Sequence, residues 1–75
     1  MKIGNTMRQE MLDALKAHAL GAIKKHKMNV EVYLQNPVGI GEHPDVMSAI
    51  ESELDQISHY HDQLEVIKEY IEGDA

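Results

Sequence analysis

The sequence predicts an all-α fold, an antiparallel helical hairpin with helices over about residues 6–35 and 44–72. Two long segments carry apolar residues three and four positions apart, and a stretch rich in Gly and Pro, residues 36–45, separates them. Residues 1–36 contain six basic and three acidic side chains, whereas residues 37–75 contain one basic and ten acidic side chains. These opposite charges favour two helices that lie side by side.

Capping and proline signals bound the first helix. Thr6 followed by Gln9 fits the capping box, in which each side chain binds a free backbone N–H of the other residue. Pro37 disfavours helical geometry at Asn36 and supplies no N–H of its own. The first helix is therefore expected to end near Gln35.

The second helix has a proline start and a glycine stop. Pro44 suits the first helical position, where its missing N–H is harmless, and Asp45 lies near the positive end of the helix dipole. Gly73 is a typical C-terminal stop. Glu69 and Glu72 fall in the last turn, where the dipole disfavours anions, so we expect this end to fray.

The loop length sets the register of the hairpin. A loop of about eight to ten residues returns the chain antiparallel, and facing residue numbers then sum to about 80. In this register His26, inside the apolar arc of the first helix, lies level with Glu53. We expect either a half-buried His26–Glu53 pair, in which the carboxylate holds the imidazole protonated, or a histidine bound to a backbone or water group.

The apolar arcs are too wide for one neighbouring helix. They cover roughly 180° of the first helix and roughly 160° of the second, whereas a two-helix seam needs only a narrow stripe. Ala19 and Ala22 would let a further helix approach closely. A symmetric pair of hairpins that forms a four-helix bundle would cover both arcs. The residues predicted to carry this association are Leu12, Leu15, Ala19, Ala22, Ile23, Val30, Leu54, Ile57, Leu64 and Ile67.

Composition argues against an enzyme. The chain has no Cys, which excludes disulfides, thiolate zinc sites and cysteine nucleophiles. Gly39 and Gly41 form too short a pair for a phosphate-binding loop, and no Ser, His and Asp stand in a catalytic context. The 75 residues form at most one domain, residues 1–75, with little volume for a pocket. We expect no catalysis and no cofactor.

The sequence also indicates neither a membrane nor a nucleic-acid partner. Residues 1–6 lack the apolar run of ~7–15 residues that a secretory leader needs, and no segment approaches the ~18–20 uncharged residues of a transmembrane helix. Lys24, Lys25 and Lys27 form the only basic cluster, and the net charge of −6 opposes binding to phosphates. We expect a cytoplasmic protein in which this cluster is a solvated stripe.

A second functional hypothesis is that the chain forms a metal-binding helical bundle. Ferritin-like di-metal sites need Glu-x-x-His, and no Glu lies three residues before any of the five histidines. His61 and Glu65 share a helix face and His18 lies at the same level of the hairpin, so these three are candidate ligands. A further cluster, opposite the apolar arc, is interpreted as a solvated surface that would hold only an adventitious ion: Asp55, His59 and Asp62.

The loop is the most specific string in the chain. Val38 and Ile40 are apolar and are expected to cap the end of the bundle, while Pro37 and Pro44 stiffen the two exits. A stiff loop is also suited to docking. The candidate docking residues are Val38, Ile40, Glu42 and His43.

The loop sequence also resembles that of a group of phage proteins. The string from Asn36-Pro-Val-Gly-Ile-Gly-Glu-His-Pro to Asp45, preceded by Val32-Tyr33-Leu34 and followed by an acidic helix, resembles small uncharacterised proteins of marine tailed phages, including cyanophages. The resemblance covers roughly residues 25–71 and brings no catalytic or binding residues with it. It implies a phage protein that acts in the virion or on a host protein in the host cytoplasm.

Three functional hypotheses follow from these observations. The first is a non-catalytic interaction or assembly protein of phage origin that self-associates, with a dimer favoured. The second is the metal-binding bundle that uses His18, His61 and Glu65. The third is an adaptor whose apolar arc receives a helix of a host protein, which predicts a free state that is unstable or concentration-dependent.

Overall fold

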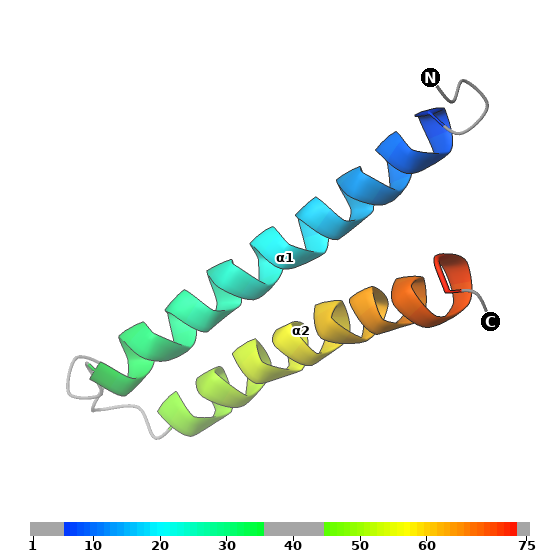
Figure 1. Ribbon diagram of the computed structural model, residues 1–75. Helices are drawn as coiled ribbons and strands as arrows, with labels where there is room; N and C mark the ends of the chain where they lie inside the picture. The colour runs from blue at the N-terminus through cyan, green and yellow to red at the C-terminus, as the bar shows by residue number, and fades with distance from the viewer. Residues whose placement is uncertain (1–5, 36–44, 74–75) are drawn as a thin grey trace.

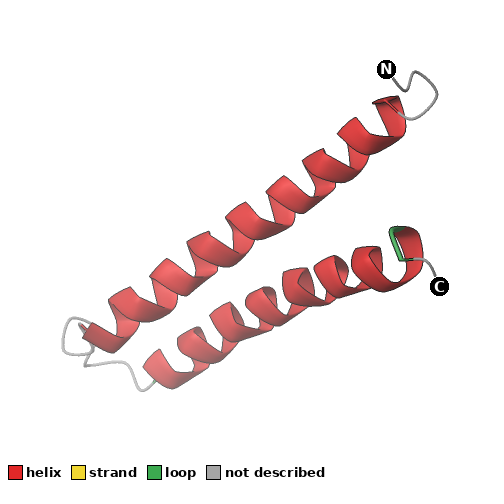
Figure 2. Cartoon of the chain, in the orientation of Figure 1, coloured by secondary structure: helices red, strands yellow, loops and turns green. Residues whose placement is uncertain are grey.

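Two antiparallel helices make up the fold of a computed structural model that describes residues 6–35 and 45–73. Helix α1 spans Thr6–Gln35 and helix α2 spans Val46–Val66, which continues into a π-helical turn, η3, Ile67–Ile71. The helices lie side by side (Figure 1), and the described residues contain no strand (Figure 2). The predicted all-α hairpin is confirmed.

Helix α2 begins two residues later than the sequence predicts. Asp45 occupies the N-cap position with φ −96° and ψ 16°, and its side chain makes no capping hydrogen bond. The backbone N–H of Ala49 donates to the Asp45 carbonyl at 2.9 Å. In α1, the Gln9 amide donates to Asp13 at 3.0 Å, and the partner of Gln9 in the predicted capping box lies outside the described side chains.

The end of α2 is held against α1. The Glu72 N–H donates to the Ile67 carbonyl at 2.8 Å, which closes the wider π-helical turn. The Arg8 guanidinium donates to the Ile71 carbonyl at 3.0 Å, and the Lys16 ammonium pairs with the Glu72 carboxylate at 2.6 Å. The fraying expected at this end is therefore replaced by a helical turn with two ties to α1.

Cross-helix contacts fix the register. His26 meets Glu53, the Arg8 guanidinium meets the Ile71 carbonyl, and the His18 and Tyr60 rings lie 5.5 Å apart. The residue numbers of each pair sum close to 80, as the loop length predicts.

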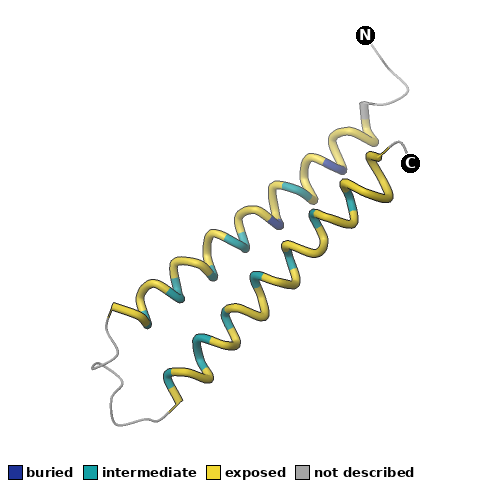
Figure 3. The backbone as a smooth tube through the Cα atoms, turned by 60° about the horizontal axis from the view of Figure 1, so that its bottom comes forward, coloured by how far each residue is buried: buried dark blue, intermediate teal, exposed yellow. Residues whose placement is uncertain are grey.

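The seam between the helices buries little. Among the described residues only Leu12 and Ala19 are buried apolar side chains, with exposed fractions of 6% and 0%. Half-buried residues line the facing sides of both helices (Figure 3). The close approach expected at Ala19 thus occurs with α2 of the same chain.

The hairpin is a flat rod. Its dimensions are 58 × 22 × 13 Å and its radius of gyration is 17.3 Å, against about 11 Å for a compact domain of this length. None of the described helices combines the length and the apolar character that a membrane crossing requires.

Candidate interaction surface

A polar cluster lies in the middle of the seam. His26 Nδ1 is 2.6 Å from Glu53 Oε1, and Asn29 Nδ2 donates to the same oxygen at 3.0 Å. The His26 and Glu53 side chains are 15% and 18% exposed. The half-buried His26–Glu53 pair is confirmed. Asn29 was not predicted, although its position almost one turn after His26 is the signal that could have found it.

The cluster favours the charged form of Glu53. Hydrogen bonds from Asn29 and then from His26 lower the pKa of Glu53 below its ordinary value of 4.5. Partial burial acts in the opposite direction, and the positive charges of His26 and Lys25 add to the lowering. The cluster joins α1 and α2 through one carboxylate oxygen of Glu53.

The candidate metal ligands do not form a site. His18, His61 and Glu65 are all exposed on the hairpin. The described residues contain no group of three or more His, Asp or Glu side chains placed to hold a metal ion. The reason is geometric, because one neighbouring helix covers only a narrow part of each predicted arc.

The second histidine cluster is also not assembled. Asp55, His59 and Asp62 are exposed, as expected, but His59 Nε2 lies 3.3 Å from the Gln63 amide nitrogen. The His59 ring stands edge-on to Tyr60, with centroids 4.8 Å apart. His59 thus contacts the aromatic and amide side chains of its own helix.

The ten predicted association residues divide into three groups. Leu12 and Ala19 are buried inside the hairpin, and Leu15 and Leu54 are 56% and 47% exposed. The rest are half-buried at the seam: Ala22, Ile23, Val30, Ile57, Leu64 and Ile67. The buried and half-buried residues hold the hairpin itself together, which leaves Leu15 and Leu54 as the open positions.

Much apolar surface stays open. The large apolar side chains left exposed are Met7, Met11, Leu15, Leu20, Met28, Val32, Leu34, Met47, Leu54, Val66, Tyr70 and Ile71. Met7, Met47 and Tyr70 are about 70% exposed. The prediction that the arcs are wider than one neighbouring helix can cover is confirmed.

The total surface of the chain, polar and apolar together, is also larger than that of a compact monomer. The chain exposes 5970 Å². A compact monomer of its mass, 8.5 kDa, would expose about 4,700 Å². The excess of roughly 1,300 Å² is larger than the ~800 Å² that each partner contributes to a standard protein interface.

The lysine cluster and the loop were also predicted to lie on the surface of the protein. Lys24, Lys25 and Lys27 are exposed, as expected of a solvated stripe. The four loop docking candidates lie outside the described residues: Val38, Ile40, Glu42 and His43. Comparisons of the chain with protein-family models, with curated proteins and with solved structures gave no match.

Proposed function

We propose that this chain is a non-catalytic interaction or assembly protein that works as a homo-oligomer of helical hairpins. The observation that carries the proposal is the open apolar surface. A single layer of two helices has no second layer of its own to cover that surface, and folded domains normally need two layers around a core. A second hairpin supplies the missing layer and makes a four-helix bundle.

The small core of the hairpin also supports self-association. A chain of this length hides only about 60% of its unfolded surface even when compact, and this hairpin hides less than a compact chain does. Among the residues that the structure describes, two buried apolar side chains make a small core. Small domains of this kind gain stability from disulfides, metals or oligomerisation, and the chain has no Cys.

Phage origin is part of the proposal and rests on the resemblance of the loop string alone. In that setting the bundle would act in the virion or on a host protein in the host cytoplasm. The self-association does not depend on this assignment, because it follows from the surface of the helices.

The solution mass tests the proposal. Light scattering over a wide range of concentrations should give a stable multiple of 8.5 kDa, with a dimer expected. A well-folded 8.5 kDa monomer at every concentration would contradict the proposal. It would then favour the adaptor hypothesis, in which a helix of another protein covers the apolar surface.

A further inference from the structure

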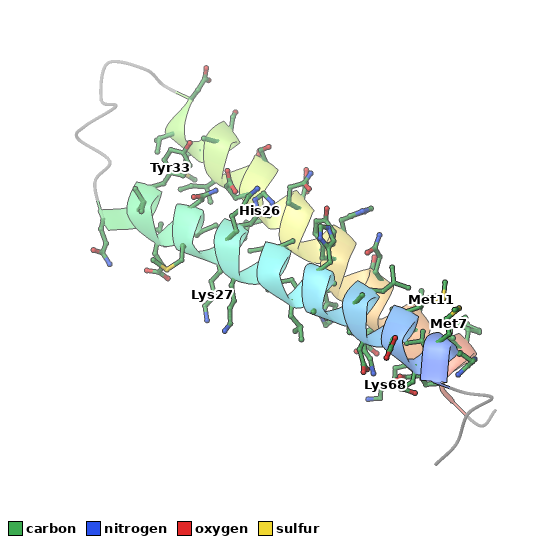
Figure 4. All side chains as sticks on the ribbon, turned by 90° about the horizontal axis from the view of Figure 1, so that it is seen from above. Met7, Met11, His26, Lys27, Tyr33 and Lys68 are labelled. Carbon is green, nitrogen blue, oxygen red and sulfur yellow. The ribbon has the colours of Figure 1, made fainter. Side chains whose placement is uncertain are left out.

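The flat hairpin has two broad sides. Residues about 90° from the seam on each helix project onto one side or the other. The edge contact between His18 and Tyr60 marks the first side, and the Lys16–Glu72 ion pair marks the second. Figure 4 shows the same division, with Met7 and Met11 on one side and Lys27 and Lys68 on the opposite side.

The first side is almost free of charge, and we call it the neutral face. It is defined by the following exposed residues of α1 and α2: Met7, Met11, His18, Ser52, Gln56 and Gln63. Among the described residues within about 60° of this direction, Lys25 is the only charged side chain of α1, and α2 contributes none from Val46 to Val66, while Asp45 at its N-cap lies in the same direction.

The second side, the charged face, mixes ions with its apolar residues. It is defined by the following residues of α1, α2 and η3: Lys16, Leu20, Lys27, Leu54, Glu65 and Lys68. Leu20 lies one turn from Lys16 and from Lys24, and Leu54 lies one turn from Glu51. Burying these leucines would therefore also take charges out of water, at a cost that an interface recovers only with well-placed partners.

The neutral face offers apolar contact without that cost. Met7, Met11 and Leu15 are 71%, 60% and 56% exposed along one edge of it. The Tyr60 ring, with His18 and His59 edge-on, adds an aromatic surface between the helices. The cores of protein interfaces are depleted in charge and enriched in Met and Tyr, and the neutral face has few charges and carries Met7, Met11 and Tyr60 beside the uncharged polar residues of α2.

We propose that two copies of this chain pair neutral face to neutral face about a two-fold axis. This inference rests on the proposed self-association and names the surface that carries it. The excess surface of roughly 1,300 Å² is enough for a standard interface on each copy. The charged faces then point outward, where water and salt screen the like charges of the two acidic α2 helices.

Two matched leucine variants test the choice of face. Leu15→Lys puts a charge at the edge of the neutral face, and Leu54→Lys puts the same charge on the charged face at similar exposure. A two-fold interface contains each change twice, so Leu15→Lys should weaken the dimer at least about 100-fold. Leu54→Lys should change the dissociation constant by less than about threefold, because an exposed position outside the interface stays in water. Sedimentation equilibrium measures both, and circular dichroism checks that helicity is kept.

Other outcomes would overturn the inference. If Leu54→Lys weakens association as much as Leu15→Lys or more, the neutral face is not the dimer interface. Head-to-tail stacking, with the neutral face of one copy on the charged face of the next, would give masses that grow with concentration and sensitivity to both variants. These results leave the proposed self-association intact, whereas a monomeric wild-type chain removes it as well.

A labelling experiment tests the same inference without disturbing the interface. The chain has no Cys, so Ser52→Cys and Ser58→Cys each create a single thiol by exchanging one atom. Both serines are exposed on α2, and Ser52 lies on the neutral face while Ser58 lies beyond it. Alkylation of the Ser52→Cys thiol should slow about tenfold at concentrations where the dimer forms, because thiol reactivity requires access. Equal slowing of both variants, slowing of Ser58→Cys alone, or no slowing of either would contradict the proposed face.

Discussion

At the scale of single residues, Glu53 is the acidic side chain in the middle of the contact between the helices. It accepts hydrogen bonds from His26 and Asn29 on α1, at 2.6 and 3.0 Å through one oxygen. Both bonds favour the carboxylate, and the pKa of Glu53 is accordingly lowered. Protonation of Glu53 would remove the charge that both donors bind.

The lowered pKa predicts a pH dependence of stability. A carboxyl group whose pKa is lower in the folded than in the unfolded chain stabilises the fold above its unfolded value, 4.5, and this contribution is lost as the pH falls through the folded pKa. Glu53→Gln should therefore melt below the wild type at pH 7, and the difference should shrink as the pH falls below 4.5 toward the folded pKa. Thermal melts followed by circular dichroism, at equal chain concentration, measure this.

Glu51→Gln is the control for that prediction. Glu51 is an exposed carboxylate on the same helix and makes no described contact with α1. Its replacement should leave the pH dependence of melting unchanged. If Glu53→Gln and Glu51→Gln melt alike at every pH, the hydrogen bonds to Glu53 contribute nothing to the stability of the hairpin.

At the scale of the helices, two glycines occupy opposite environments. A Cβ at Gly21, in the middle of α1, would have no atom within 4 Å. A Cβ at Gly73, after η3, would lie 2.9 Å from the carbonyl oxygens of Lys68 and Glu69. Gly73 therefore acts as the predicted stop through close backbone approach, and the described glycines include none with a positive φ.

Alanine substitutions should separate these two roles. Gly21→Ala should stabilise the chain by about 0.5–1 kcal/mol, because it lowers the conformational freedom of the unfolded state at no steric cost. That gain raises the Tm of a domain of this size by roughly 2–8 °C. Gly73→Ala should give no gain or a loss, since the last carbonyls must move away. A rise in Tm for Gly73→Ala equal to that for Gly21→Ala would contradict the close approach.

The ends of α2 show what local sequence signals can and cannot predict. Gly73 and the position of α1 follow from capping and proline rules, which act through the backbone of neighbouring residues. The π-helical turn and the Arg8 bond to the Ile71 carbonyl were not predicted. The Arg8 bond joins residues 63 positions apart, and rules that act between neighbouring residues cannot include such a partner.

At the scale of the whole molecule, the decisive feature is that the chain forms one layer. The rod is only 13 Å thick and carries exposed methionines and leucines along its length. Stability and association should therefore be coupled, because a partner that covers this surface binds the folded chain and not the unfolded one.

This coupling predicts a melting temperature that depends on concentration. A tenfold rise in chain concentration favours the folded dimer over two unfolded chains by about 1.4 kcal/mol, so the Tm should rise by a few degrees. Melts over a hundredfold range of concentration measure the shift. The Leu15→Lys variant is the control and should melt at a lower temperature that does not depend on concentration. A wild-type Tm that stays constant over this range would contradict the coupling.

The sequence by itself determined the two helices and their antiparallel register, and it placed His26 level with Glu53 without deciding that they pair. These features follow from helical periodicity, from turn residues and from the length of the loop. Only the tertiary structure decided which parts of the wide apolar arcs are covered, that Ala19 packs against α2 of the same chain, and that the candidate metal ligands stay exposed. The physical reason is that an apolar arc shows which side of a helix tends to be buried. How much of that side is buried depends on how many helices pack against it. One neighbour covers the seam and leaves the neutral face open.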